Sequence, residues 1–478
     1  MSNPMIHSEA EVKAQRQRSL YIVAIVSAAA LGAFLFGYDG AIMGAAIPYM
    51  AEQFHMTAAM RGFVMTNGVI GCLFGTLTGS WLCDRIGREK TLMVCASLLG
   101  VGALMTAICT DITIPGGVIS TLTVFNTFRI LGGFAIGLGC VASPMYIAEV
   151  APPHMRGKLG VTYQLALVIG SAAAPLAAYP ISLFLPAETS WRWMFASQMV
   201  VVVLLFVFLF LIPSSPRWLA AKGRFKEALD VLKKIHEPAL AERELAEITA
   251  SINEEQELQG GWKELFAPGV RYALLIGLLL AFFNNWTGWS AMGGYITTLV
   301  ELSGVTSHST AILQFAFTYV AMAIFTAISL FLVDRVGRRP LWIFASILMA
   351  LVTFATGLVF HYHIQGWVVL LVLCLCTVPH GIALGGLPWL MMSELYPNRV
   401  RAKAVALNTT FLWVVIYSCG QLFPIFLQFS TDHIGSGAGV FWLFTVICVL
   451  STIFGCTIMP ETKGRTLEEI AGSWTKKK

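Results

Sequence analysis

The stretch DRIGR, at residues 84–88, returns almost unchanged as DRVGR at residues 334–338, 250 residues later. EVAPPHMR at residues 149–156 also returns, as ELYPNRVR at residues 394–401, with an offset of 245. A third pair has an offset of 247: PSSPRW from Pro213 and PETKGR from Pro460. Three separate motifs at nearly one offset predict a chain built from two related halves.

The composition predicts a membrane protein. The chain has 478 residues, of which 57% are hydrophobic and 12% charged, with mean hydropathy +0.74. Soluble domains carry about 25% charged residues, and a spanning helix needs about 20 mostly apolar ones. We therefore expect an all-α polytopic membrane protein with 12 transmembrane helices in two six-helix pseudo-repeats, with short cytoplasmic helices between them. The expected spans are 20–49, 61–83, 91–110, 118–147, 157–185, 191–213, 271–300, 308–333, 340–361, 366–393, 403–430 and 438–459.

The distribution of charge predicts the orientation. Of 31 Lys and Arg residues, only Arg61 and Arg192 fall in loops on one side, and Arg129 lies inside a span. The positive-inside rule then places both termini in the cytoplasm. The net charge of +5 reflects this asymmetry, so it does not indicate a nucleic-acid partner. The first span is too long for a cleaved signal, and the ten scattered Cys are interpreted as small buried hydrophobes.

A polar segment separates the two halves. It contains two stretches that are typical of short amphipathic helices, GRFKEALDVLKKIH and AERELAEITASINEEQEL. The expected organisation is a cytoplasmic tail at 1–19, a six-helix bundle at 20–213, an intracellular helical domain at 214–270, a second bundle at 271–459 and a cytoplasmic tail at 460–478.

These motifs, together with GYDG, RILGGFAIGLG and PWLMMSELYPNRVRAKA, resemble the sugar porter family of the major facilitator superfamily over nearly the whole chain. The resemblance implies the major facilitator fold, four short intracellular helices, alternating access and a monomer. No Walker A loop, dinucleotide fingerprint or catalytic triad spacing appears, so we expect no cofactor, no metal and no enzymatic activity. Transport would draw on an ion gradient or on the substrate gradient.

Two charges stand where hydrocarbon is expected. Asp39 of FGYDG lies in the first span, and Arg129 lies at similar depth in the fourth. Ionisable residues inside membranes are rare and usually pair, so we predict an Asp39–Arg129 ion pair. The resemblance implies that Asp39 is the proton-coupling site and Arg129 its partner, since passive relatives often have Asn here. A static structural ion pair is the alternative.

The repeated motifs predict a cytoplasmic gate. Carboxylates accept Arg forks well, and pairs between the halves would lock this side when the protein faces outward. Charge that only sets topology is the alternative. Glu89 and Ser214 depart from the family pattern, which has a second Arg and a Glu there, and we expect them to soften the gate. The candidate gate residues are Asp84, Arg85, Arg88, Glu149, Arg156, Arg217, Asp334, Arg335, Arg338, Glu394 and Arg401.

The resemblance also implies a sugar site between the halves, with unusual residues in span seven. FFNNWTGWSAMGGY has an Asn pair where relatives carry Gln, and its glycines allow the span to break. His380 stands at a position often aromatic, so a sugar acid, polyol or modified sugar is an open possibility. Packing between helices is the alternative for each residue. The candidate substrate-binding residues are Phe36, Gln164, Asn284, Asn285, Ser290, His380, Trp389, Asn408 and Trp413.

The favoured function is import of a sugar-like solute by proton symport. A uniporter or exporter on the same fold is the alternative, and a non-transporting nutrient sensor is the third, although the 18 residues after Pro460 are short for a sensor tail. The expected partners are the small solute, protons and membrane lipids. The expected location is the plasma membrane, as a multi-pass protein of a bacterial inner membrane.

Overall fold

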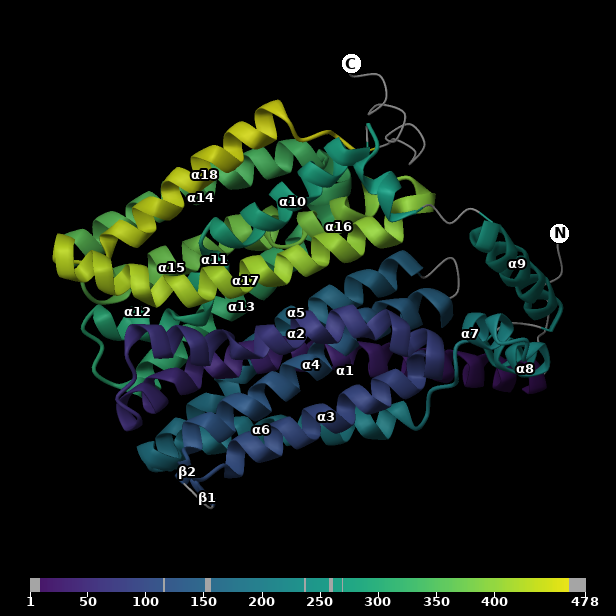
Figure 1. Cartoon of the computed structure of the whole chain (residues 1–478), viewed down its shortest axis with the longest axis horizontal. Coiled ribbons are helices and arrows are strands. Elements are labelled where there is room, and N and C mark those ends of the chain that lie inside the picture. The colour runs from purple at the N-terminus through teal and green to yellow at the C-terminus, as the bar shows by residue number, and fades with distance from the viewer. Residues whose placement is uncertain are drawn as a thin grey trace.

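The computed structural model describes residues 9–114, 117–150, 156–235, 238–257, 261–268 and 270–463. Two helical bundles lie side by side along their length (Figure 1). We call them the N-half and the C-half. The N-half contains α1 (Glu9–Gln53), α2 (Ala58–Ile86), α3 (Arg88–Ile108), α4 (Thr121–Val150), α5 (Arg156–Phe184) and α6 (Ala187–Leu209). The C-half contains α10 (Val270–Trp286), α11 (Trp289–Gly294), α12 (Ile296–Leu302), α13 (His308–Val336), α14 (Arg338–His361), α15 (Trp367–Pro379), a π-helix (His380–Leu384), α16 (Leu387–Glu394), α17 (Asn398–Ile434) and α18 (Ala438–Thr457).

The polar segment forms helices at one end of the bundles, which we call the motif end because DRIGR and DRVGR lie there (Figure 1). Its elements are α7 (Pro216–Ala221), α8 (Phe225–Ile235), α9 (Pro238–Glu257) and a 3₁₀ helix (Trp262–Phe266). Helix α8 is amphipathic and buries Ala228, Leu232 and Ile235. The other end of the bundles is called the opposite end.

The twelve-helix, two-repeat fold is confirmed, with one span in pieces. Among the described residues, eleven helices are long and apolar enough to cross a membrane. The twelfth span, expected at 271–300, consists of α10, α11 and α12. Gly288 has φ +112°, a conformation that residues with a Cβ rarely adopt, and it lies in the break between α10 and α11 that the glycines were expected to allow. The span expected at 366–393 is also interrupted, by the π-helix at His380, which the sequence did not predict.

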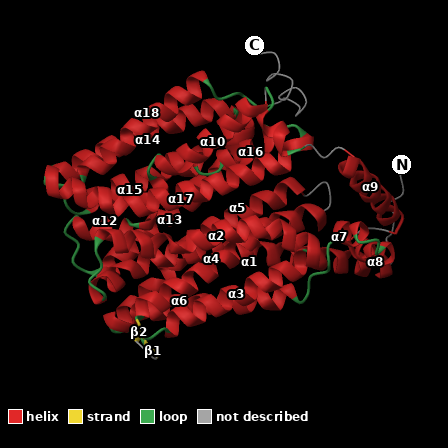
Figure 2. Cartoon of the chain, viewed as in Figure 1, coloured by secondary structure: helices red, strands yellow, loops and turns green. Residues whose placement is uncertain are grey.

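A short β-hairpin is the other departure from an all-helical chain. Strands β1 (Ile112–Ile114) and β2 (Gly117–Ile119) pair antiparallel at the opposite end (Figure 2). The fourth span was expected from residue 118, but α4 begins at Thr121. The Asp111 carboxylate accepts hydrogen bonds from the backbone N–H and the hydroxyl of Thr121, at 2.6 and 2.7 Å, which fixes this start.

Matching residues start and end the helices of each half. Thr57 and Ser307, 250 residues apart, accept backbone N–H bonds at the first turns of α2 and α13. Gly87 and Gly337, also 250 apart, join α2 to α3 and α13 to α14 with φ of +94° and +102°. Only glycine adopts this backbone region without strain, which explains the Gly of DRxGR.

Small residues bring helices α2 and α4 into close contact. A Cβ placed on Gly71 would lie 1.9 Å from the carbonyl oxygen of Ile130, and one on Gly133 would lie 1.8 Å from that of Gly68. These glycines therefore let α2 and α4 approach each other closely. This packing sets the position of Arg129, which lies on the same stretch of α4.

Candidate functional site

The buried Asp39–Arg129 ion pair is the central feature of the N-half. Nη1 of Arg129 on α4 donates directly to Oδ1 of Asp39 on α1, and each residue is 6% exposed. The guanidinium also lies 5.5 Å from the centre of the Phe195 ring on α6. Arg129 Nε is buried without a hydrogen-bond partner. Loss of either charge would leave the other buried and unpaired, which is costly in a low-dielectric interior.

Two further polar contacts join α1 and α4, the helices that carry this pair, to neighbouring helices, and the sequence analysis did not select their residues. The Asn67 amide on α2 donates to Asn126 on α4 at 2.6 Å, one helical turn from Arg129. The hydroxyls of Tyr38 and Ser197 are 2.6 Å apart and join α1 to α6. The available signal was the presence of several polar residues in otherwise apolar spans.

The two amides of span seven bind other parts of the protein. Nδ2 of Asn284 donates to the carbonyl oxygens of Leu384 and Gly385, at 2.6 and 3.1 Å. Nδ2 of Asn285 donates to Ala281 and to Asn284 Oδ1, both at 3.2 Å. Both donors are therefore satisfied within the protein, and Asn284 holds the broken spans seven and ten together in this conformation.

Ser290 connects the Asn pair to the surface of α11. Its hydroxyl donates to Oδ1 of Asn285 at 2.7 Å, and the residue is exposed. It is therefore the one of the three span-seven candidates that a solute can reach directly.

His380 lies at the start of the π-helix and is 6% exposed. Its ring centre is 6.0 Å from that of Trp289, a contact that the sequence did not predict, and Nδ1 is buried without a hydrogen-bond partner. In this conformation His380 packs inside the C-half, and a bound solute would reach it only after the neighbouring helices move.

The remaining substrate candidates occupy different environments. Phe36 of the N-half and Trp413 of the C-half meet with ring centres 5.9 Å apart, and Trp413 Nε1 donates to Thr76 Oγ1 at 2.9 Å. Gln164 on α5 is half-buried, and Trp389 on α16 is 41% exposed. Phe36 and Trp413 therefore lie where the two halves meet.

Asn408 lies away from these residues. It is fully buried, and its amide donates to the hydroxyl of Tyr396. A Cβ on Gly277 would lie 2.4 Å from Asn408 Nδ2, so α10 and α17 close tightly over it. Asn408 is therefore part of a helix–helix contact in this conformation.

The N-half gate motifs form one hydrogen-bonded group. Arg88 reaches Oε1 of Glu149 through Nε at 3.1 Å and Nη2 at 2.8 Å. Its Nη1 lies 3.2 Å from Asp84 Oδ1, and Ser215 donates to the second Glu149 oxygen at 2.5 Å. The group joins α2, α3, α4 and the start of α7.

The C-half repeats this group. Arg338 Nη2 lies 3.1 Å from Glu394 Oε1, and its Nη1 lies 3.4 Å from Asp334 Oδ1. Thr462 donates to Glu394 Oε2 at 2.6 Å, as Ser215 does to Glu149. The Ser and the Thr belong to the third repeated motif, so the three motifs that reveal the sequence repeat meet in space.

In this conformation the gate Asp residues pair within their own half rather than with the neighbouring half. Each Arg follows its Asp by four residues, across the tight turn at Gly87 or Gly337, and the two side chains lie next to each other. Arg85 is exposed and lies 5.1 Å over the Trp81 ring, and the carbonyl of Arg335 accepts from Lys463 at 2.6 Å. The other candidate gate residues are Arg401, which donates to the carbonyl of Tyr396, Arg217, which is half-buried, and Arg156, whose side chain lies outside the described part of the structure.

At the opposite end, hydrogen bonds join the two halves directly. Thr297 of α12 donates to the carbonyl of Gly44 at 2.6 Å, and Gln421 of α17 donates to that of Ala59 at 3.0 Å. Ser309 of α13 donates to the carbonyl of Ser182 at 3.2 Å. The halves are therefore closed against each other at this end.

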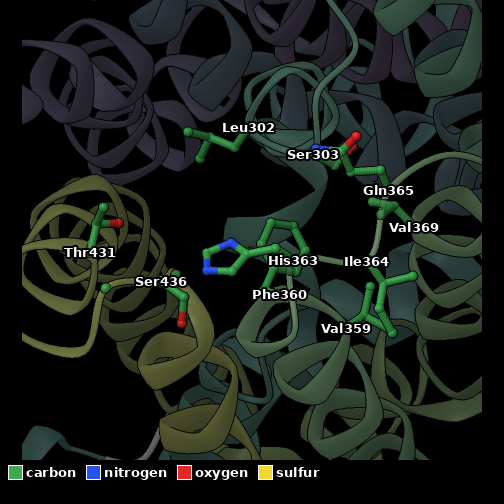
Figure 3. Close-up of a pocket in the computed structure, with 12 residues that line it drawn as sticks. Leu302, Ser303, Val359, Phe360, His363, Ile364, Gln365, Val369, Thr431 and Ser436 are labelled. Carbon is green, nitrogen blue, oxygen red and sulfur yellow. The ribbon is translucent and has the colours of Figure 1, made fainter.

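One small cavity lies apart from all these residues. It has a volume of about 120 Å³ within the C-half at the opposite end, and the His363 imidazole points into it (Figure 3). Leu302, Ser303, Thr431 and Ser436 lie around the ring (Figure 3). No side chain predicted to bind substrate lines this cavity.

The comparisons with known proteins agree with this geometry. Residues 25–474 match the family model described as "Sugar (and other) transporter". The chain is 36% identical to the arabinose–proton symporter of Bacillus subtilis over 486 residues, covering 100% of both chains. It is 32% identical to the D-xylose–proton symporter of Escherichia coli K12 over 482 residues, covering 95% of this chain and 96% of the relative.

Solved structures give the same result. The inward open conformation of the xylose transporter XylE from E. coli superposes with a TM-score of 0.82 at 29% identity, covering 95% of this chain and 100% of XylE. XylE bound to 6-bromo-6-deoxy-D-glucose has a TM-score of 0.77 at 30% identity, covering 96% and 100%. The chain therefore belongs to the sugar transporter family of the major facilitator superfamily, and it is a multi-pass membrane transporter rather than an enzyme.

Proposed function

We propose that this protein imports a sugar or sugar-like solute together with protons, and that Asp39 carries the proton. The observation that supports this most directly is the buried Asp39–Arg129 pair. Protonation of Asp39 removes the partner of Arg129, so movement of the helices and movement of the proton are linked. The names of relatives, which are arabinose, xylose and galactose proton symporters, support the same coupling.

The proposed mechanism is alternating access between the halves. The hydrogen bonds at the opposite end and the TM-score of 0.82 to an inward open relative support an inward-facing state of this structure. We propose that the motif end faces the cytoplasm of a bacterium, as the Lys and Arg distribution predicts. A cross-half lock by the gate residues remains our prediction for the outward-facing state.

For the substrate we favour a neutral sugar or polyol over a sugar acid. A carboxylate solute needs a free cation, and Arg129 is neutralised by Asp39, while His380 is packed against Trp289. Gln164, Ser290 and Trp389 remain accessible, and they suit hydroxyl groups and a sugar face. A thermal-shift panel of arabinose, xylose, galactose, polyols and uronates tests this, because a ligand that binds only the folded state stabilises it.

The coupling is tested in vesicles with an imposed pH gradient, using the sugar that the panel identifies. We expect Asp39→Asn to abolish uphill accumulation while sugar exchange at equal pH persists. Asp111→Asn is the matched control, since Asp111 is an exposed residue just before strand β1, away from the buried pair, and its substitution should leave accumulation unchanged. If Asp39→Asn accumulates sugar at the wild-type level, the ion pair has a structural role only and Asp39 does not carry the coupling proton. Gradient-independent uptake by the wild type would favour the uniporter.

A further inference from the structure

A cavity of about 450 Å³ lies between the halves at the opposite end. Charged and titratable groups from both halves line it: Glu52 from α1, His55 from the turn after α1, Arg61 from α2, Glu301 from α12 and His308 from α13. The transport mechanism proposed above uses none of them.

The His308 ring lies between two carboxylates. Its Nδ1 is 2.6 Å from Glu301 Oε1, and its Nε2 is 3.3 Å from Glu52 Oε2. A neutral imidazole has a single N–H, whereas ionised carboxylates only accept hydrogen bonds. Both contacts are satisfied together only when the cluster holds one more proton, most simply as the imidazolium. The cluster of Glu52, Glu301 and His308 therefore holds an extra proton in this arrangement.

This proton bridges the two halves. Glu52 belongs to the N-half, while Glu301 and His308 both belong to the C-half. The Tyr49 ring of α1 also packs on the His308 ring, with centres 4.6 Å apart. The Glu52 side chain is 78% exposed and that of His308 29% exposed, so the bond is in contact with solvent and can exchange protons.

The other charged groups around the cavity leave this arrangement intact. Arg61 donates through Nε to the carbonyl of Met56 at 3.3 Å, and its own carbonyl accepts from Tyr295 at 3.4 Å. His55, held at φ +46°, lines the cavity from the turn after α1. His308 is the group among these that contacts carboxylates of both halves.

We propose that Glu52, Glu301 and His308 form a proton-dependent latch that holds the opposite end closed, separate from the Asp39 site. Opening this end carries Glu52 away from His308, so the closed state binds the latch proton more tightly than the open state. By linkage, low pH favours closure, and the effect is lost as pH rises and the imidazolium loses its proton. The inference rests on the proposed alternating access, but it requires neither substrate nor proton coupling.

The test uses the full chain carrying Asp39→Asn, so that the coupling proton contributes nothing, and Cys456→Ser, which removes the exposed thiol. Spin labels at Glu188→Cys in the N-half and Asp432→Cys in the C-half, both exposed residues away from the latch, report the distance across the opposite end between pH 8 and pH 5. We expect the ratio of closed to open molecules to rise about two- to fivefold as pH falls, the range of a partly exposed ion pair.

Two matched substitutions make the test specific. Glu52→Gln removes the contact between the halves, and the pH response should disappear. Glu301→Gln changes the same chemical group on the same imidazole but within the C-half, so the response should persist at lower pH. His308→Gln should abolish the response. The latch would be overturned if the Glu52→Gln protein kept the full pH response. It would also be overturned if the parent protein, with Glu52 intact, showed no pH response. The spin-label distances test the latch, and accumulation in vesicles tests proton coupling. A protein that did not couple transport to protons would still show the pH-dependent distances, so either proposal can be wrong without the other.

Discussion

Arg88 of the N-half and Arg338 of the C-half occupy equivalent positions, and each binds a Glu that also accepts a hydroxyl hydrogen bond. The two groups differ in exposure, because the Glu149 side chain is 8% exposed and that of Glu394 is 21% exposed. The N-half group is therefore less accessible to solvent, so its charges are stabilised more by one another and less by water.

The halves also differ in how they place negative charge at the following helix. In the C-half, Glu461 accepts from the backbone N–H groups of Arg338 and Arg339 at 3.1 and 3.0 Å, at the N-terminus of α14. In the N-half, Ser214 replaces that Glu, and Glu89 in the first turn of α3 supplies the carboxylate, to which Ser214 donates.

The comparison indicates that Glu89 and Ser214, the two departures from the family pattern, are linked to each other. A helix N-terminus favours a nearby anion, and each half provides one from a different chain segment. Glu89 and Ser214 were expected to soften the gate. Their direct contact indicates a compensated exchange, and the effect on the gate stays a prediction.

The largest expected difference between the halves comes from removing the central Arg. Arg88→Ala should lower the free energy of unfolding by about 3–5 kcal/mol, because Glu149 is left buried and unpaired. Arg338→Ala should cost about 1–3 kcal/mol, because Glu394 is more exposed to solvent than Glu149, while each Glu keeps its hydroxyl hydrogen bond. Reversible unfolding in mixed detergent micelles measures both, with Arg85→Ala as the exposed control. Equal losses would show that burial does not distinguish the groups.

The turn glycines should behave alike in both halves. Gly87→Ala and Gly337→Ala each force a Cβ into a backbone region near φ +100°, which costs about 1–3 kcal/mol. Gly132→Ala is the control, since a Cβ there meets nothing within 4 Å. The same unfolding assay applies, and a stable variant at either turn would mean that the backbone relaxes.

Two substitutions, Ser214→Glu and Glu89→Arg, would give the N-half the same charges as the C-half at these two positions. Ser214→Glu alone should destabilise the protein, because it places a second carboxylate beside Glu89. Adding Glu89→Arg should restore stability, with a coupling of about 0.5–3 kcal/mol between the two changes. Additive effects in the double-mutant cycle would contradict the compensation between these positions.

The smallest expected effect is a pH dependence confined to the C-half. Partial burial acts to raise the pKa of Glu461, but backbone N–H bonds from Lys463, Arg338 and Arg339 outweigh it and lower the pKa below the usual 4.5. The contribution to stability is therefore complete above pH 4.5 and is lost as pH falls through the lowered pKa. Glu461→Gln should remove this component, worth up to about 1 kcal/mol. Parallel wild-type and variant curves below pH 4.5 would exclude it.

Much of the molecule could be predicted from the sequence. The spans follow from hydrophobic length, the two halves from repeated motifs, and the Asp39–Arg129 pair from the cost of an unpaired charge in hydrocarbon. The break in span seven follows from its glycines. These predictions depend either on residues that are close together in the sequence or on general rules, such as the cost of an unpaired charge in hydrocarbon, that apply at any position in the fold.

The tertiary structure alone decided which distant groups meet. It showed that Asn284 binds the π-helix of span ten, that the gate Arg residues pair within their halves, and that Glu52 reaches His308 across the opposite end. A hydrogen bond requires partners within about 3 Å, and such positions depend on how whole helices pack. The sequence by itself determined which charges needed partners, and the packing of the two halves determined which partners they found.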